Sequence, residues 1–494
     1  MRNEIILKGR IWTLRGFVQR RWPLLLAVFP ILLLLGCQTS QVVMNQPLPQ
    51  HSGNPSPYGG GYRLLDMIQP PKGEILLALA FSGGGKRSAA FAHGALRGLR
   101  EVPVVENGVT RPLLDEVDYI AAVSGGSFPA MHYGLYRDKS FETFPQEFLY
   151  RDIESYIYGI YLLPWNWEWL INPLYGTNDA MAEIYDKLMF HGATYADLLK
   201  RGLPVISINA TDIANGVSFP FTQPTFDLIC SDLTKFPLAR AVAASNGFPV
   251  LFSPITLKSY HADCHGQRPP DAPPASWATD AALSRRTENA IIANRYLNPD
   301  RTKYVHLMDG GIADNLALRA LLNAFIGLNR DSESVRHVAL STRRVLVISV
   351  DGEAAADPTL GEQRIVTGLG QVFSAVSGSQ IDAYNFETLV LAQEQVKAIV
   401  EDVKKDRCAQ AAAIDGHACD DVTGTLVHLS LADVADPAAR ARLQAIPTGL
   451  TIPKQDVDTL VQYGEQLVRN NETIRATISG LDDLPVDPRH VASR

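Results

Sequence analysis

The 494-residue sequence lacks several features that would directly assign it to a functional class. It has no internal repeat, no H-E-x-x-H pattern of a zinc-binding helix and no calcium-binding EF-hand pattern, so we expect no metal and no cofactor. Basic residues are also outnumbered: 45 Lys and Arg stand against 52 Asp and Glu, giving a net charge of −7. Because an acidic chain is repelled by phosphate backbones, nucleic acid is excluded as a partner.

Long hydrophobic runs are equally scarce. An apolar stretch from Trp22 to Leu35 follows a basic start, and it is too short to span a membrane comfortably, which is typical of a signal peptide. It ends in Leu34-Leu35-Gly36-Cys37, which resembles the lipobox of bacterial lipoproteins. We expect cleavage before Cys37 and lipid attachment to it, with Gln38 favouring an outer-membrane location facing the periplasm. A plain secretory cleavage or an uncleaved anchor remains the alternative.

Removal of residues 1–36 would also change the charge of the chain. These residues hold six basic residues and one acidic residue, so their loss lowers the net charge from −7 to about −12. The remaining chain does not bind an anionic membrane by its overall field. Membrane contact would therefore depend on the lipid at Cys37 and on local apolar surface.

Cysteine is rare, with five residues in the whole chain. With Cys37 set aside, the remaining four are Cys230, Cys264, Cys408 and Cys419. An even number in an oxidising compartment permits two disulfides. We favour Cys230 with Cys264 and Cys408 with Cys419, because each pair closes a loop within one region; four free thiols are the alternative.

A glycine loop follows the first strand-like run, Ile75 to Phe81. Residues 83–85 are three glycines, and the helix predicted from Ser88 to Arg100 comes directly after Lys86 and Arg87. Glycine N–H groups at a helix N-terminus hold an oxyanion well, so Gly83, Gly84 and Gly85 are candidate donors. A nucleotide-binding P-loop fits poorly, because Ala80 replaces its first glycine and Arg87 its Ser or Thr; a plain tight turn is the other alternative.

Ser124 stands in the second informative segment, Ala122-Val-Ser-Gly-Gly126. A buried-strand pattern precedes the serine and a helix-compatible stretch follows it, which is the layout of a nucleophile elbow. The usual G-x-S-x-G pattern begins with glycine, and alanine is its least disruptive replacement. A structural serine in a turn of small residues is the alternative.

A nucleophilic serine needs a base, and none of the eleven histidines stands in a suitable place after a late strand. Asp309 does: it follows the apolar run Tyr304 to Met308 and precedes two glycines. A carboxylate at a strand end is able to face Ser124. Asp351, which follows the run Val345 to Val350, is a rival, and a turn aspartate is the third possibility.

The three segments in this order resemble the patatin-like phospholipases. The run Arg240 to Pro249, with Phe252 and Pro254, resembles the alanine-serine-proline block of that family. Asp314-Asn315 resembles its acidic-asparagine pair, although Ala317 stands where the family usually has proline.

The resemblance implies an acyl-ester hydrolase without metal or cofactor. It assigns Ser124 as nucleophile, Asp309 as base and Gly83, Gly84 and Gly85 as oxyanion hole, with membrane lipid or another acyl ester as substrate. A catalytically silent lipoprotein that binds lipid or a partner, and an acyltransferase using the same acyl-enzyme, remain open.

The pattern of strands and helices predicts a three-layer α/β/α fold with a mainly parallel central sheet and added C-terminal helices, and the resemblance implies that this fold is patatin-like. We expect a signal peptide over 1–36, a flexible tether over 37–73, a catalytic domain over 74–352 with an insertion at about 262–300, and a helical extension over 353–494. Tyrosine and tryptophan crowd into 150–175, which suggests a lid or an acyl-chain entrance, with an ordinary core-covering helix pair as the alternative.

Overall fold

The computed structural model describes most of the chain. The described residues are 45–49, 57–68, 73–106, 108–163, 175–249, 251–280, 284–326, 333–352, 369–479 and 481. The predicted signal peptide, Cys37 and the three tryptophans at 165, 167 and 169 lie outside them. Within the described residues, no helix has the length and apolarity to cross a membrane, and no cluster of three or more His, Cys, Asp or Glu is placed to hold a metal ion.

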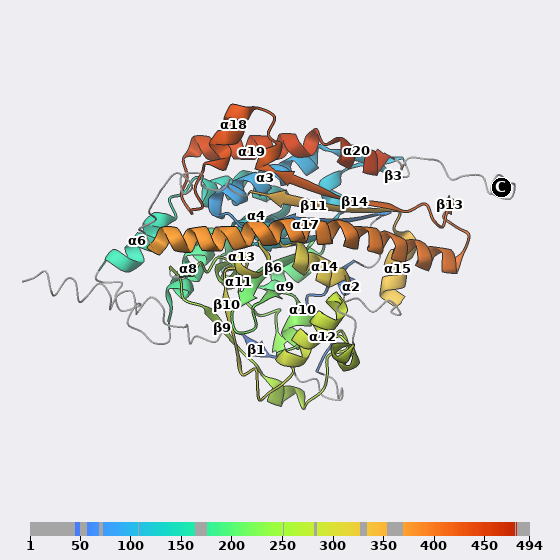
Figure 1. Ribbon diagram of the computed structural model, residues 1–494, viewed down its shortest axis with the longest axis horizontal. Coiled ribbons are helices and arrows are strands. Elements are labelled where there is room, and N and C mark those ends of the chain that lie inside the picture. The colour runs from blue at the N-terminus through green and yellow to red at the C-terminus, as the bar shows by residue number, and fades with distance from the viewer. Residues whose placement is uncertain are drawn as a thin grey trace, which may run out of the picture.

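A mixed sheet of eight described strands forms the centre of the molecule (Figure 1). Its order is β14 (Thr423–Ser430), β11 (Arg344–Asp351), β2 (Ile75–Phe81), β5 (Val117–Val123), β6 (Val205–Asp212), β10 (Tyr304–Met308) and β9 (Ile255–Lys258), with β7 (Val217–Pro220) also paired to β6.

The first five strands of this order are parallel, whereas β10 and β7 run antiparallel to β6, and β9 runs antiparallel to β10. Strands β2, β5, β6 and β11 are buried along their whole length, as expected for parallel strands covered on both faces. The predicted mainly parallel centre is confirmed.

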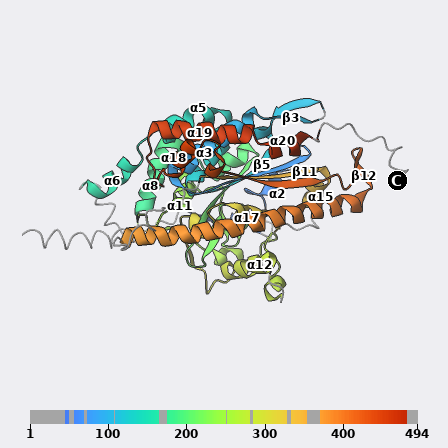
Figure 2. The same cartoon turned by 45° about the horizontal axis from the view of Figure 1, so that its top comes forward.

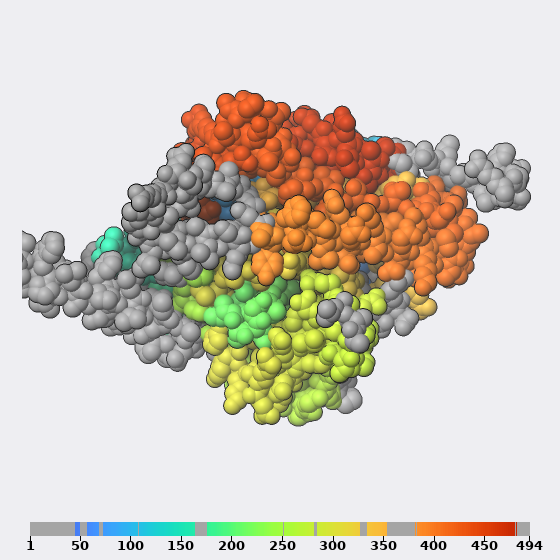
Figure 3. Space-filling view, in the orientation of Figure 1, coloured from blue at the N-terminus to red at the C-terminus, as the bar shows by residue number. Residues whose placement is uncertain are grey.

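Helices cover both faces of the sheet, so the three-layer architecture is also confirmed. Figure 2 shows α3 (Gly85–Glu101), α19 (Lys454–Arg469) and α20 (Glu472–Ser479) above the sheet and the long α17 (Leu369–Gln410) below it. In the space-filling view, α17 crosses the visible face between the C-terminal helices and the insertion (Figure 3). The C-terminal helices α19 and α20 thus complete the layer of helices that begins with α3, directly after the glycine loop.

The helices α3 and α19 cross at unusually short distance, and glycines make this possible. A β-carbon at Gly94 would overlap the carbonyl oxygen of Val461, and one at Gly464 would overlap that of Phe91. Because the missing side chains let the backbones touch, α19 is held directly on the helix that carries the glycine loop.

The C-terminal region differs from the prediction. It contains the expected helices, but it also supplies β14, which pairs in parallel with β11 along eight residue pairs. A boundary at residue 352 therefore divides one sheet. The run from Thr423 to Ser430 alternates in burial. The hydrophobic pattern of a single edge strand of this kind is hard to distinguish from that of the neighbouring helical segments.

The prediction of a flexible tether is wrong for residues 45–49 and 57–68. Strand β1 (Gln46–Pro47) pairs with β8 (Ser231–Asp232), and Tyr62 is fully buried with its hydroxyl accepting the N–H of Ile206 at 2.6 Å. Arg63 forms a buried ion pair with Asp227. The Pro-, Gly- and Ser-rich composition predicted flexibility because a small number of side chains, these among them, anchor the segment.

Two disulfides tie peripheral segments to the body. One joins Cys230 to Cys264 at the start of the insertion, and the other joins Cys408, near the end of α17, to Cys419. Within the insertion, helix α12 (Arg285–Tyr296) reaches the sheet through the Tyr296 hydroxyl, which donates to Asp212 at 2.8 Å.

Candidate active site

Ser124 occupies a strained turn between β5 and α4 (Ser127–Tyr136). Its φ angle is 48°, a left-handed conformation that residues other than glycine seldom adopt. A β-carbon at Gly125 would overlap the carbonyl oxygen of Gly85, and one at Gly126 would lie 2.7 Å from that of Ser82. The two glycines are therefore required by close packing against the glycine loop, and the geometry is that of a nucleophile elbow.

The carboxylate in contact with Ser124 is that of Asp309. The Ser124 hydroxyl donates to Asp309 Oδ2 at 2.9 Å, while Oδ1 accepts the N–H of Gly311 at 2.8 Å. Removal of the carboxyl group from water raises the pKa of Asp309 to about 6, although the bonds from Gly311 and Ser124 act in the opposite direction. A carboxylate with this pKa is a stronger base than an ordinary aspartate and is still ionised at neutral pH.

The rival aspartate lies elsewhere. Asp351 Oδ2 is 3.8 Å from Nε2 of His428 on the neighbouring strand β14. The residue after it, Gly352, accepts a hydrogen bond from the Arg87 side chain at 2.6 Å and donates its N–H to Ser82 at 2.9 Å. Asp351 thus faces strand β14 and its neighbour Gly352 supports the glycine loop, whereas Asp309 is the residue brought to the serine.

Two residues whose roles the sequence did not reveal hold the elbow in place. Ser245 Oγ accepts the N–H of Ser124 at 2.8 Å and donates to the Asn209 carbonyl at 2.7 Å. The Asn246 amide group donates to the Ser124 carbonyl at 3.0 Å and to Ser127 Oγ at 2.9 Å. Both lie at the end of α11 (Leu238–Ser245), inside the alanine-serine block identified from the sequence.

The glycine loop faces Ser124, with one change from the expectation. The N–H of Gly83 already donates to the Asn315 carbonyl at 2.9 Å, so it is not available to an oxyanion. A β-carbon at Gly83 would overlap Asn315 Oδ1 and lie 3.4 Å from the β-carbon of Ser124. Gly84 and Gly85 adopt positive φ angles of 128° and 62° and lead into α3. The structure therefore leaves two of the three predicted donors.

Residues 79–322 match the family model described as patatin-like phospholipase. This part of the chain is a patatin-like phospholipase domain. Among solved structures, human GIVD cytosolic phospholipase A2 aligns with a TM-score of 0.42 and 14% sequence identity. That alignment covers 85% of this chain and 62% of the human one. A comparison with curated protein sequences gives no match.

The basic pair of the patatin-like domain points inward. The Lys86 ammonium group donates to the Arg151 carbonyl, and burial lowers the pKa of Lys86 to about 8. The Arg87 guanidinium group donates to the carbonyls of Gly352 and Ile446. Both side chains are almost entirely buried. The two side chains therefore fasten the glycine loop to neighbouring segments.

The departure from the family pattern at Ala317 has a visible cause. Ala317 has a φ angle of 58°, which proline cannot adopt because its ring fixes φ near −65°. Before it, Asp314 Oδ2 accepts the N–H of Ala320 at 2.9 Å and so anchors the start of α14 (Leu318–Ile326). The turn after Asp309 therefore follows a path that needs a residue other than proline.

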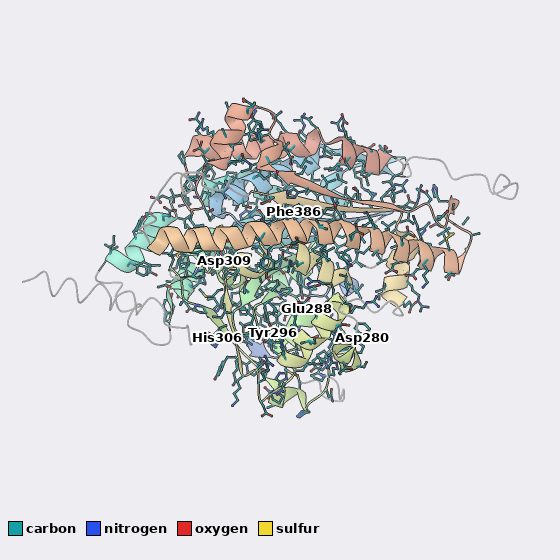
Figure 4. All side chains as sticks on the ribbon, viewed as in Figure 1. Asp280, Glu288, Tyr296, His306, Asp309 and Phe386 are labelled. Carbon is teal, nitrogen blue, oxygen red and sulfur yellow. A yellow bond between two sulfur atoms is a disulfide. The ribbon has the colours of Figure 1, made fainter. Side chains whose placement is uncertain are left out.

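The described part of the aromatic segment includes α6 (Glu154–Leu162), which projects from one end of the molecule (Figure 1). Tyr158 and Leu162 on this helix are 59% and 69% exposed. The Tyr161 hydroxyl bonds the Leu251 carbonyl, which links α6 to the chain that follows Asn246. Helix α13 (Gly311–Asp314), which follows Asp309, packs against α17, and Figure 4 shows Asp309 beside α17. Phe386 lies on α17 itself and is 67% exposed.

Proposed function

We propose that the protein is a serine hydrolase that cleaves fatty-acyl esters of lipids through a Ser124–Asp309 dyad and an acyl-enzyme. The 2.9 Å hydrogen bond from the Ser124 hydroxyl to the Asp309 carboxylate carries this proposal. The patatin-like phospholipase domain supports the class of substrate.

In the proposed reaction, Asp309 accepts the proton of Ser124 as Oγ attacks the ester carbonyl carbon. The tetrahedral oxyanion that forms accepts hydrogen bonds from the N–H groups of Gly84 and Gly85, and from that of Gly125 directly after the nucleophile. Collapse breaks the ester bond, and the proton on Asp309 passes to the leaving alkoxide. Water, deprotonated by the same carboxylate, then hydrolyses the acyl-enzyme and restores Ser124.

The test is fatty-acid release from phospholipid vesicles by wild-type protein and by Ser124→Ala. Ser479→Ala is a matched control, because among the described residues its hydroxyl bonds the Ala476 carbonyl of its own helix and nothing in the candidate site. We expect release from wild type and the control and none from Ser124→Ala. Release that persists in Ser124→Ala would exclude the dyad, and absence of release from wild type would favour a binding protein.

We propose further that the chain is a lipoprotein of the bacterial envelope, held by lipid on Cys37 at the outer membrane and facing the periplasm. The proposal is supported by the basic start, the short apolar stretch and the Leu-Leu-Gly-Cys sequence. Membrane fractionation of Cys37→Ser tests it: loss of the protein from the membrane fraction is the expected result, and full retention would overturn it.

A further inference from the structure

A loop from the C-terminal region lies directly on the glycine loop of the candidate site. It spans residues 446–451, between α18 (Pro437–Gln444) and α19, and is outside the patatin-like match. The N–H of Lys86 donates to the Gly449 carbonyl at 2.7 Å, and a β-carbon at Gly85 would overlap that same oxygen. The contact therefore fixes the peptide between Gly85 and Lys86.

The side chain of Arg87 makes a second connection between the two loops. Its guanidinium group bonds the Ile446 carbonyl and lies 3.3 Å from the Thr448 hydroxyl, while its Nε reaches the Gly352 carbonyl. One buried side chain thus joins the start of α3, the end of β11 and the C-terminal loop. An arginine buried in this way holds its position firmly, because its guanidinium group would keep an unsatisfied buried N–H if any of these acceptors moved away.

The opposite side of loop 446–451 is attached to the start of α6. Glu154 Oε1 accepts the N–H of Leu450 at 2.9 Å, and the N–H of Glu154 donates to the Thr451 hydroxyl at 3.1 Å. That hydroxyl in turn donates to Asp152 Oδ1 at 2.8 Å. The loop is therefore held between the catalytic face and the exposed helix α6.

We propose that loop 446–451 positions the oxyanion donors for catalysis, with Thr448 and Thr451 as positioning residues. The inference rests on the proposed function, because it assigns the loop a role in the same reaction. Donors of an oxyanion hole stabilise the transition state only when their N–H groups point at the developing charge, so a shift of the Gly84 to Lys86 backbone lowers turnover. The loop prevents that shift from outside the family domain.

The experiment compares wild type with Thr448→Val, Thr451→Val and the double variant on a soluble chromogenic short-chain ester. Valine keeps the shape of threonine and removes the hydroxyl. Thr459→Val is the matched control, because its hydroxyl bonds the Gln455 carbonyl within α19 and, in the part of the chain that the structure describes, does not touch loop 446–451. We expect the double variant to lose roughly tenfold in kcat with little change in KM, since misplaced catalytic groups cost rate more than binding.

A trifluoromethyl ketone provides the second measurement, because it adds to the serine and places an oxyanion in the hole. Its affinity should fall by the same factor as kcat/KM in the double variant and remain unchanged in Thr459→Val. Wild-type kcat and wild-type ketone affinity in the double variant would overturn the proposal, as would an equal loss in Thr459→Val. A failure of the proposed function is distinguishable, because wild type itself would then show no Ser124-dependent turnover.

Discussion

Ser124 and Asp309 are 185 positions apart in the sequence, and their side chains meet across strands that run in opposite directions. Strand β5, which ends at the serine, is parallel to β6, whereas β10, which ends at the aspartate, is antiparallel to it. Asp309 reaches the serine because the chain after β10 passes tightly along β6, where a β-carbon at Gly310 would overlap the Asn209 carbonyl. The glycine after Asp309 therefore sets the position of its carboxylate.

The two aspartates should respond differently to removal of their charge. Asp309→Asn keeps the shape of the side chain but cannot accept the serine proton, so we expect turnover to fall about a thousandfold. Asp351→Asn should stay close to wild type, because that carboxylate faces His428. Turnover of both variants on one ester provides the measurement, and the opposite ranking would reassign the base.

The activity should depend on pH in the direction that a base requires. Because burial raises the pKa of Asp309 to about 6, the carboxylate is protonated and inactive below that value. We expect kcat/KM to rise with pH through about 6 and then to level off. A profile that stays flat from pH 4.5 to 8, while the protein remains folded, would contradict an Asp309 base with this pKa.

The same pKa makes a prediction about stability. A carboxyl group whose pKa is raised on folding favours the folded state while it is protonated, and this contribution is lost as pH rises from about 4 to about 6. The amide of Asp309→Asn does not ionise, so the variant does not lose this stability as pH rises. It should therefore have a higher Tm than wild type at pH 7 and a similar Tm at pH 4. Thermal unfolding at the two pH values tests this; a lower Tm at pH 7 would be against it.

The crossing of α3 and α19 should not tolerate a side chain at Gly94. Gly94→Ala places a methyl group on the Val461 carbonyl, which the backbone can relieve only by separating the helices, at a cost of about 3 kcal/mol. Gly59→Ala is a matched control, because no atom lies within 4 Å of the added carbon. Urea unfolding of both variants checks the prediction, and equal stabilities would show that the helices separate freely.

Position 317 offers a test in which the family residue is the harmful one. Ala317→Gly should stabilise the fold by about 1 kcal/mol, because glycine adopts the positive φ angle without strain. Ala317→Pro should destabilise it strongly and reduce turnover, since the altered turn moves Asn315 away from Gly83. Stability and activity that improve with proline would mean that the left-handed turn is not required.

Anionic lipid should not accelerate the reaction. Lys86 and Arg87 are occupied by backbone carbonyls, and the chain carries a net negative charge. We expect initial rates on phosphatidylcholine vesicles to fall as phosphatidylglycerol is added and to recover when salt screens the repulsion. Faster hydrolysis of the anionic vesicles would require a different source of positive charge near the site.

The local patterns were sufficient for several central strands and for the pair Ser124 and Asp309. The runs Ile75 to Phe81 and Tyr304 to Met308 match β2 and β10 to the residue, because short apolar runs next to glycines have few other interpretations. Ser124 and Asp309 were found by their places at strand ends, and the structure brings them together.

The remaining features depend on contacts between distant segments, which no local pattern records. Examples are the Asn315 carbonyl that occupies the Gly83 N–H and the inward turn of Arg87. The attachment of Tyr62 to β6 and the pairing of β14 with β11 are of the same kind. In each case the partner lies more than seventy residues away, and its identity is decided by packing of the complete sheet.

The order of strands in the sheet also determines when the protein is able to fold during its synthesis. Strand β2, which leads into the glycine loop, pairs with β11, and β11 pairs with β14. A ribosome that has released residues 1–322, including all three segments of the candidate site, has not yet made either of these partners. The nascent chain therefore exposes an unpaired apolar strand edge until Thr423–Ser430 has been made, and an exposed edge of this kind favours aggregation.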